Sequence, residues 1–245
     1  MITSELGLYT LPHLPAPVGI GDLRGGMKRV HLKEITPIPF CFIPGVKVVG
    51  DGFLSTDMMR GEETELMGIM REEYGDCVYV LPGSHSKVIK TDRMGRIEQF
   101  STLLTGEMAQ ALAENTILRS SVDLKNDALN ATFLYKGYLH CRAHGINQAL
   151  FKARVAGVLF GTSPEEIYSF YLGVILCPEI GEILSYTPET VVVGGRKQLR
   201  EALALLLEKI GGTTVVKLSE QEVAESVTRG MLRIYYAQGG EHDAV

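Results

Sequence analysis

The chain has 245 residues, of which 45% are hydrophobic and 22% are charged. This composition predicts a globular protein with a sizeable core and excludes wholesale disorder. The 24 basic and 29 acidic side chains give a net charge of −5 at pH 7, which argues against a nucleic-acid partner, because general nucleic-acid binders carry a basic surplus. The longest apolar stretches are interrupted before the ~18 residues that a membrane span needs, so no membrane association is predicted.

The N-terminus and the cysteines favour a cytoplasmic location. Residues 1–9 have neither the basic head nor the apolar block of a signal peptide. His140 and His144 lie close to a cysteine, but no second ligand pair has the spacing of a zinc site, so an amphipathic helix explains them better and no metal ligand is assigned. The cysteines are widely spaced, form no CxxC pair and are typical of reduced thiols: Cys41, Cys77, Cys141 and Cys177.

Short strands and irregular connections are predicted at the beginning of the chain. The first 50 residues hold six of the ten prolines, and residues 11–17 are turn-rich because proline removes backbone donors and favours extended geometry. After candidate N-caps at 55–57 the pattern becomes regular. It predicts a helix over 58–71, a short strand over 77–81, a polar loop over 82–87 and a hairpin over 88–104.

The rest of the chain is predicted to be mainly helical, with two strands near its end. Helices are expected over 107–117, over 126–160 as a pair broken near Gly145, and from Ser163 onward, where serine, proline and two glutamates are typical of a helix start. A strand over 190–193, a diglycine turn, a helix over 196–210, a strand over 213–218 and a helix over 220–236 complete the chain. This order predicts an α/β fold, in which ligands bind at the carboxyl ends of the strands.

Three carboxylates are gathered near the start of the first predicted helix: Glu62, Glu63 and Glu65. Negative charge at a helix N-terminus is stabilised by the helix dipole, by ~0.3–1 kcal/mol, which explains them without any function. Alternatively, one of them faces a ligand and accepts the proton of a substrate hydroxyl group. In phosphoryl transfer such a base serves mainly to orient the hydroxyl, because that reaction depends chiefly on positioning and electrostatic stabilisation.

The polar loop over 82–87 has the residue types of a phosphate site. Gly83 allows close approach of the backbone to a ligand, Ser84 and Ser86 offer hydroxyl donors, and Lys87 offers a point charge suited to phosphate. An ordinary polar turn explains the loop equally well. It is not a Walker phosphate loop, because the glycine, lysine and serine or threonine spacing of that motif is absent.

Three weaker signals lie elsewhere. Gly194 and Gly195 connect a strand to a helix, which places backbone amides beside any bound anion or nucleotide. Thr105 opens a helix after a strand, as simple capping would require. The third signal is the polar segment at the N-terminus, which by itself is uninformative: Thr3, Ser4 and Glu5.

Together, these motifs resemble the 2-dehydro-3-deoxygalactonokinase family. The resemblance rests on residues 59–68 (MRGEETELMG), 80–87 (VLPGSHSK), 104–107 (LTGE) and 192–195 (VVGG), whose order and spacing match and which cover essentially the whole chain. That family is similar to the sugar kinase, actin and heat-shock ATPase superfamily. The resemblance implies two α/β domains with ribonuclease H-like cores, with nucleotide and sugar acid meeting between them.

The resemblance also implies a reaction and a role for each matched residue. The reaction is ATP- and Mg²⁺-dependent phosphorylation of the 6-hydroxyl group of 2-dehydro-3-deoxy-D-galactonate, in D-galactonate degradation. Glu62 is expected to be the catalytic base, with Glu63 as the second choice, and Arg60 is expected to bind the substrate carboxylate. The remaining assignments are Thr3, Ser4 and Glu5 to the sugar acid, Gly83, Ser84, His85 and Lys87 to the β- and γ-phosphates, Thr105 to the nucleotide, and Gly194 and Gly195 to the adenosine.

Two departures from the family pattern accompany the resemblance. The Asp-x-Gly-x-Thr hairpin that forms the first phosphate loop of the superfamily is absent, so the first domain is expected to be N-terminally truncated. Residues 1–76 are then the remainder of domain one, and residues 77–245 are domain two with a helical insertion near 120–185. The second departure is Pro178, which is expected to kink or break its helix at a cost of ~3 kcal/mol or more.

Two other functions stay open from the sequence. One is a truncated, non-catalytic module of the same fold that binds the sugar acid and the nucleotide. The other is an α/β interaction domain whose charged motifs are merely solvated faces. The preferred sugar-acid epimer and the formation of a homodimer are likewise left open.

Overall fold

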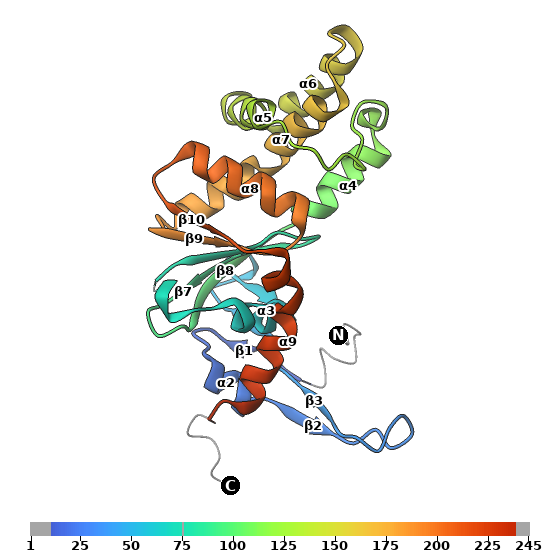
Figure 1. Ribbon diagram of the computed structural model, residues 1–245. Helices are drawn as coiled ribbons and strands as arrows, with labels where there is room; N and C mark the ends of the chain where they lie inside the picture. Colours follow the sequence, from blue (N-terminus) through green and yellow to red (C-terminus); the bar gives the residue numbers. More distant parts are fainter. Residues whose placement is uncertain (1–10, 75, 239–245) are drawn as a thin grey trace. The chain divides into compact units, whose positions relative to one another are not determined.

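The structure is a computed structural model, described here over residues 11–74 and 76–238 (Figure 1). Its contacts divide the chain into two compact units, and each is described by itself. Neither unit is continuous in sequence. The first unit comprises Met1–Cys77, Ile89–Thr102 and Ser219–Val245, and the second comprises Val78–Val88 and Leu103–Leu218.

The first unit contains small sheets built from short strands. β1 pairs in parallel with β4, and β4 pairs antiparallel with β5, in the order β1-β4-β5. β2 and β3 form a separate antiparallel pair, and the end of β7 lies beside β8. These short strands agree with the prediction for the proline-rich beginning of the chain. The bounds are β1 (Leu14–Pro15), α2 (Ile20–Gly25), β2 (Lys28–Val30), β3 (Phe40–Phe42), β4 (Val46–Val48), a 3-10 turn (Phe53–Ser55), β5 (Asp57–Met59), β7 (Ser86–Thr91) and β8 (Ile97–Leu103).

Two helices, α3 (Glu62–Ile69) and α9 (Glu220–Tyr236), pack against each other in the first unit. The predicted helix over 58–71 was wrong at both ends: β5 occupies Asp57–Met59, and a 3-10 turn follows at Glu72–Tyr74. The helix cannot begin before Gly61, because this residue has a φ of 110°, far from helical geometry and readily adopted only by glycine. The predicted bounds of α9 were correct.

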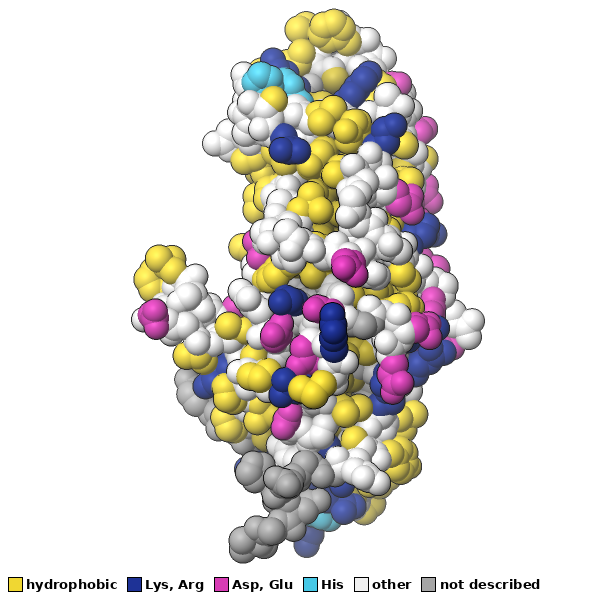
Figure 2. Space-filling model, turned by 90° about the vertical axis from the view of Figure 1, so that its left-hand side faces the viewer, with side chains coloured by type: hydrophobic (Ala, Val, Ile, Leu, Met, Phe, Trp, Pro, Cys, Tyr) yellow, Lys and Arg dark blue, Asp and Glu magenta, His cyan; other side chains and the backbone are white. Residues whose placement is uncertain are grey.

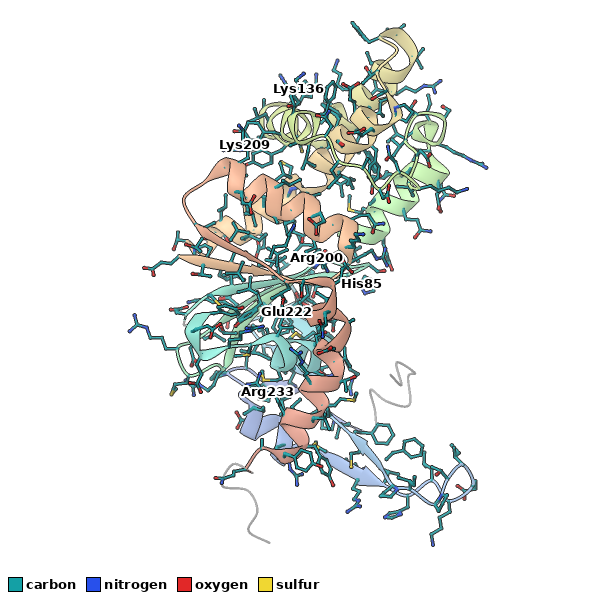
Figure 3. The ribbon with its side chains drawn as sticks, viewed as in Figure 1. His85, Lys136, Arg200, Lys209, Glu222 and Arg233 are labelled. Atoms are coloured by element: carbon teal, nitrogen blue, oxygen red, sulfur yellow. The ribbon has the colours of Figure 1, made fainter. Side chains whose placement is uncertain are left out.

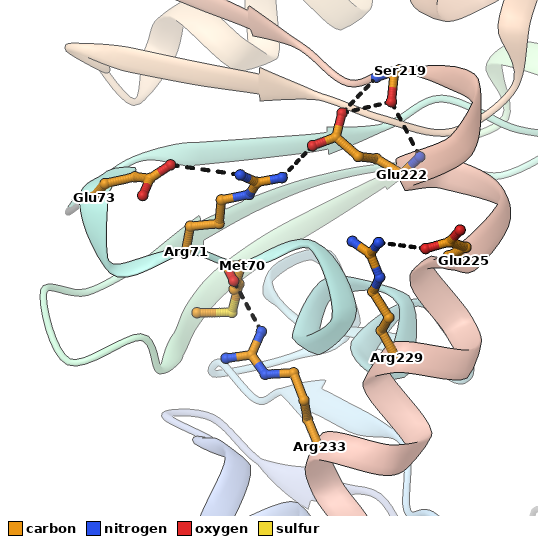
Figure 4. A network of polar contacts seen from close by, with 8 residues as sticks. All are labelled: Met70, Arg71, Glu73, Ser219, Glu222, Glu225, Arg229 and Arg233. Atoms are coloured by element: carbon orange, nitrogen blue, oxygen red, sulfur yellow. Dashed lines mark hydrogen bonds and ion pairs between the residues drawn. The ribbon is translucent and has the colours of Figure 1, made fainter.

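Polar contacts fix the C-terminal end of α3 to α9 (Figure 4). Arg233 Nη1 donates hydrogen bonds to the carbonyl oxygens of Met67, at 2.5 Å, and Met70, at 2.9 Å. Carbonyl groups at a helix C-terminus lack partners within the helix, so a guanidinium group is a suitable donor for them. Arg71, just after α3, forms an ion pair with Glu222 of α9. These contacts join segments that are more than 150 residues apart.

The second unit has a parallel sheet at its centre. β10 (Thr214–Lys217), β9 (Thr190–Val193) and β6 (Val78–Leu81) are parallel neighbours in that order, and β7 begins beside β6. All of β6 is buried, as are Val191–Val193 of β9. Continuous runs of valine are typical of parallel strands that are covered on both faces, and the predicted strands over 77–81, 190–193 and 213–218 are confirmed within a residue.

Helices form the rest of the second unit (Figure 1). The predicted pair over 126–160 is confirmed: α5 ends and α6 begins at Gly145, whose φ of 78° suits glycine. α5 and α7 cross closely, because a Cβ atom at Gly137 would lie 2.0 Å from the carbonyl oxygen of Phe170. The bounds are α4 (Thr105–Asn115), a 3-10 turn (Ile117–Ser120), α5 (Ala131–His144), α6 (Ile146–Leu159), α7 (Pro164–Ser185) and α8 (Lys197–Ile210).

α7 differs from the prediction in two respects. The helix is not broken at Pro178, because the residues on either side, such as Leu176 and Ile180, are fully buried, and their packing outweighs the lost hydrogen bond. α7 is also long and apolar enough to cross a membrane by length and composition, although the sequence was interpreted as having no such stretch. Most of it is buried within the unit, as expected of a core helix.

Charged side chains of both signs are mixed on the face shown in Figure 2. Basic and acidic groups alternate there rather than forming a patch of one sign. This distribution agrees with the small net charge of −5.

Candidate functional site

The predicted loop over 82–87 follows β6 in the second unit, but its last two residues, Ser86 and Lys87, begin β7, so the connection itself covers 82–85. Ser84 and His85 are exposed, whereas Ser86 and Lys87 are buried. The Gly83 amide donates to Ser86 Oγ at 3.3 Å, but the Ser84 and His85 amides have no acceptor among the described residues. Lys87 interacts with a partner inside the chain. Two backbone donors of the loop are therefore unpaired within residues 11–74 and 76–238 and are available to an anion.

The beginning of α4 is attached to this loop by its backbone. The Gly106 amide donates to the Gly83 carbonyl oxygen at 3.0 Å, and the Glu107 amide donates to that of Ser84 at 3.2 Å. A Cβ atom at Gly106 would lie 2.2 Å from the Gly83 oxygen, so only glycine permits this approach. The side chains also meet, since His85 Nε2 lies 2.9 Å from Glu107 Oε1. The loop and the start of α4 thus form one structural element.

The diglycine turn after β9 lies against the same loop. The Arg196 amide donates to the Pro82 carbonyl oxygen at 2.7 Å, and Arg196 Nη2 donates to Ser84 Oγ at 3.3 Å. Gly195 has a φ of 68° and would place a Cβ atom 2.4 Å from the Pro82 oxygen. Arg200, fully buried in α8, donates from Nη1 to the Gly195 oxygen at 2.9 Å (Figure 3).

The N-terminus of α8 carries positive charge where most helices carry negative charge. Arg196 is its N-cap and Lys197 its first residue, no side chain caps it, and no acidic residue lies in its first turn. By comparison, α7 and α9 both begin with a serine capping box and two glutamates. Cations are unfavourable at a helix N-terminus, so this end of α8 would be stabilised by an anion beside it.

A buried carboxyl group lies beneath the loop and the start of α4. Thr105 Oγ1 donates to Glu179 Oε2 at 2.5 Å. Burial raises the pKa of Glu179 to about 7, against the opposing hydrogen bonds from Thr105 and, more weakly, Ser86. Glu179 Oε1 has no hydrogen-bond partner among the described residues. The sequence offered one signal for this residue, a glutamate within the apolar run of α7, but gave no indication of what it contacts.

The carboxylates of α3, in the first unit, have different environments. Glu62 is partly exposed, and its Oε2 accepts a hydrogen bond from the Arg60 amide at 3.1 Å. Glu63 is 1% exposed. Its oxygens accept hydrogen bonds from the Gly61 amide, at 2.7 Å, and from Thr64 Oγ1, at 3.0 Å. Burial raises the pKa of Glu63 to about 7, and burial together with the charge of Glu62 does the same for Glu65.

The predicted cation for a substrate carboxylate, Arg60, is held close to the beginning of the described chain. Its Nη2 donates to the Leu11 carbonyl oxygen at 2.7 Å and lies 3.4 Å from His13 Nδ1. Burial, and then the charges of Arg60 and Lys47, lower the pKa of His13. Arg60 Nε is buried and has no hydrogen-bond partner among the described residues. The predicted sugar contacts Thr3, Ser4 and Glu5 lie outside the described residues.

The structure therefore brings some predicted site residues together and leaves others untested. The predicted nucleotide residues lie in one unit, where the loop, the start of α4 and the diglycine turn meet: Gly83, Ser84, His85, Lys87, Thr105, Gly194 and Gly195. Glu62, Glu63 and Arg60 belong to the first unit. The predicted meeting of these carboxylates with Gly83 stays a prediction. Sequence reasoning assigned no role to Glu179, Arg196 or Arg200.

Comparisons with known proteins identify the family. The model of the 2-keto-3-deoxy-galactonokinase family matches residues 1–234. The chain is 31% identical over 125 residues to a curated protein of Rhizobium meliloti (strain 1021) named "Probable 2-dehydro-3-deoxygalactonokinase DgoK1", a match that covers 43% of this chain and 40% of that protein. The chain thus spans less than half the length of this relative.

A solved structure has the same mixed α/β fold. It is a crystal structure of a candidate 2-dehydro-3-deoxygalactonokinase from Sinorhizobium meliloti, with a TM-score of 0.74 and 24% identity, covering 91% of this chain and 72% of that one. At this identity the similarity concerns the fold alone. The family match, by contrast, extends over nearly the whole chain and confirms the resemblance seen in the motifs. The chain belongs to the 2-keto-3-deoxy-galactonokinase family.

Proposed function

We propose that the chain is a cytoplasmic, ATP-dependent sugar-acid kinase that phosphorylates the 6-hydroxyl group of 2-dehydro-3-deoxy-D-galactonate, in D-galactonate degradation. The observation that carries the proposal is the junction of the loop over 82–87 with the diglycine turn, where Arg196 contacts Ser84 and the Ser84 and His85 amides have no acceptor among the described residues. Membership in a kinase family supports the reaction class. In this proposal both units are built on ribonuclease H-like cores.

The junction has donors that suit the phosphate groups of a nucleotide. In the proposed complex the Ser84 and His85 amides bind phosphate oxygens, and Arg196 adds a charge-assisted hydrogen bond. A Cβ atom at Gly83 would meet no atom within 4 Å, so the backbone is open to a ligand there. Lys87, buried below the loop, adds positive potential, and the adenosine lies against Gly194 and Gly195.

The proposed reaction also implies an Mg²⁺ ion, which ATP-dependent phosphoryl transfer generally uses. Within residues 11–74 and 76–238, no group of three or more His, Cys, Asp or Glu side chains is placed to hold a metal ion. Mg²⁺ usually keeps several waters and is held through substrate phosphates, so we propose that it binds together with ATP. When bound, it neutralises charge on the transferred phosphoryl group.

The sugar-acid side of the proposal rests on α3. Glu62 is partly exposed and can face the 6-hydroxyl group of the substrate, whereas Glu63 is buried and both of its oxygens accept hydrogen bonds, from Gly61 and Thr64. We therefore keep Glu62 as the base and Glu63 as a residue that shapes the start of α3. Arg60 remains the proposed partner of the substrate carboxylate.

The test is ATP-dependent phosphate transfer by the purified chain to 2-dehydro-3-deoxy-D-galactonate, with the corresponding gluconate epimer in parallel. The expected result is a phosphorylated product that requires ATP and Mg²⁺ and forms faster with the galactonate epimer. Thermal shift and calorimetry with ATP and with the sugar acid accompany the assay. Binding of both ligands without turnover would favour the non-catalytic module, and binding of neither would refute the proposal.

Gly83→Ala is the informative variant for the nucleotide side. Because the structure leaves space for a Cβ atom at this position, the thermal stability should be unchanged, while a ligand in contact with the backbone would be displaced. We expect ATP affinity to fall roughly tenfold. Gly25→Ala is the matched control, since its Cβ atom also meets no neighbour and it lies in α2 of the first unit. An unchanged affinity in Gly83→Ala would remove the loop from the proposed site.

A further inference from the structure

Glu179 is difficult to explain as a stabilising residue. Its side chain is 0% exposed and belongs to a helix whose neighbouring residues, Leu176, Ile180 and Ile183, are buried and apolar. Removing a carboxyl group from water is costly, and an apolar side chain at such a position is often at least as stable. Its contacts also do not satisfy it fully, because Oε1 lacks a partner among the described residues.

The contacts of Glu179 lead directly to the loop. Its Oε2 accepts the hydroxyl group of Thr105 at 2.5 Å, and the Ser86 hydroxyl also interacts with the carboxyl group. Ser86 Oγ in turn accepts the Gly83 amide at 3.3 Å. Thr105 is the first residue of α4, and the next two residues donate their amides to the loop. Glu179 therefore contacts both Ser86, at the end of the loop, and Thr105, at the start of α4, from the buried side.

Resting on the proposed function, we propose that Glu179 is a positioning residue of the nucleotide site: it holds Thr105 and Ser86 so that the exposed amides of the 82–87 loop stay arranged for the phosphate groups of ATP. It does not itself touch the ligand, since it is covered completely. Backbone donors bind an anion strongly only when they are already oriented, because otherwise their ordering reduces the affinity. The hydrogen bonds that Glu179 accepts from the Thr105 and Ser86 hydroxyl groups provide this order.

The neighbouring charged groups do not replace this function. His85 and Glu107 pair with each other at the surface of the junction, and Arg196 contacts the Ser84 hydroxyl group from the α8 side. Both of these contacts lie on the exposed side of the loop, at His85 and Ser84. Among the described residues, Glu179 is the side chain that contacts both Thr105 and Ser86, and it thereby joins the buried side of the loop to α4.

The experiment measures binding of inorganic tripolyphosphate and of ATP to the full chain by calorimetry. Glu179→Leu should weaken both roughly tenfold, whereas Glu179→Gln, which keeps an acceptor for Thr105, should stay within about threefold of the unchanged chain. Thr105→Val should match Glu179→Leu, and the double variant should lose no more than either single one, because both remove the same contact. Glu182→Leu, on the same helix, is the matched control and should bind normally.

A second measurement is independent of ligands. Hydrogen exchange of the peptide that contains residues 82–87 should be faster in Glu179→Leu, with exchange in β9 unchanged. If Glu179→Leu does not fold, Thr105→Val and Glu179→Gln carry the same test. Normal binding by Glu179→Leu or Thr105→Val, or an equal loss in Glu179→Gln and Glu179→Leu, would overturn the positioning role. If the unchanged chain binds neither tripolyphosphate nor ATP, the proposed function fails. The rate of hydrogen exchange in residues 82–87 then still decides whether Glu179 orders the loop.

Discussion

Gly230 of α9 is in direct backbone contact with Thr64 of α3: a Cβ atom at Gly230 would lie 1.8 Å from the Thr64 carbonyl oxygen. The contact is reciprocal, since a Cβ atom at Gly68 would lie 1.8 Å from the carbonyl oxygen of Ser226. Gly68 lies four residues after Thr64 in α3, and Gly230 lies four residues after Ser226 in α9. One turn of each helix therefore faces one turn of the other. The first unit therefore depends on two positions that tolerate no side chain.

Replacing Gly230 by alanine should strongly destabilise the first unit. The methyl group would have to displace backbone rather than a flexible side chain, so the two helices must separate. We expect a loss of about 3 kcal/mol or more in the free energy of unfolding, measured by urea denaturation. Gly181→Ala is the matched control: it lies in α7 with no atom within 4 Å of the added Cβ. Alanine should be neutral or stabilising there, and equal losses in both variants would contradict the explanation.

The buried carboxyl group of Glu63 should make stability depend on pH. Its pKa is about 7 in the folded chain, compared with 4.5 for an unperturbed glutamate. The folded state therefore binds the proton more tightly, and its contribution to stability is complete below pH 4.5 and is lost as the pH rises through 7. Glu63→Gln should lessen the fall in unfolding free energy between pH 5 and pH 8 by roughly 2 kcal/mol.

The measurement for Glu63 is chemical denaturation at both pH values, with Glu72→Gln as control. Glu72 is exposed and lies just after α3, so its substitution should leave the pH dependence as it is. The same argument applies to Glu179, whose pKa is also about 7. A pH dependence that is identical in Glu63→Gln and the unchanged chain would mean that this carboxyl group is not protonated preferentially in the folded state.

Glu62→Ala should separate catalysis from nucleotide binding. If Glu62 orients the sugar hydroxyl group, its loss should lower kcat by about a hundredfold or more and leave the affinity for ATP nearly unchanged. Glu65→Ala provides a comparison on the same helix, because its carboxyl group is not assigned to the reaction. Steady-state kinetics and ATP calorimetry are the two measurements. Turnover within a few-fold of normal in Glu62→Ala would exclude it as the base.

Gly106→Ala should detach α4 from the loop. The added methyl group would lie 2.2 Å from the Gly83 carbonyl oxygen, so the two backbone segments must move apart. The free energy of unfolding should fall by roughly 1–3 kcal/mol, and the affinity for ATP should fall as well. Gly83→Ala, by contrast, should lower the affinity for ATP without lowering stability, because the added methyl group meets no atom within 4 Å in the folded chain. A Gly106→Ala protein with normal stability and normal ATP binding would show that the contact is not required.

Much of the secondary structure followed from local sequence. The span of α9 was predicted correctly because a serine cap and an amphipathic pattern lie within its own residues. The strands around 78–81 and 190–193 were recognisable from continuous apolar runs. The helix predicted over 58–71 was wrong at its ends because its apolar spacing does not reveal that 57–59 pairs with β4. Pairing depends on residues elsewhere in the chain.

The sequence by itself determined the family, the order of the elements and the residue types at the nucleotide loop, because motifs, capping and periodicity are properties of neighbouring residues. Only the tertiary structure decided that Glu63 is buried while Glu62 is not, and that Glu179, 74 residues from Thr105, lies beneath the start of α4. Both depend on which helix faces pack together. Burial and the resulting pKa come from contacts between distant segments, and no local pattern in a single sequence contains them.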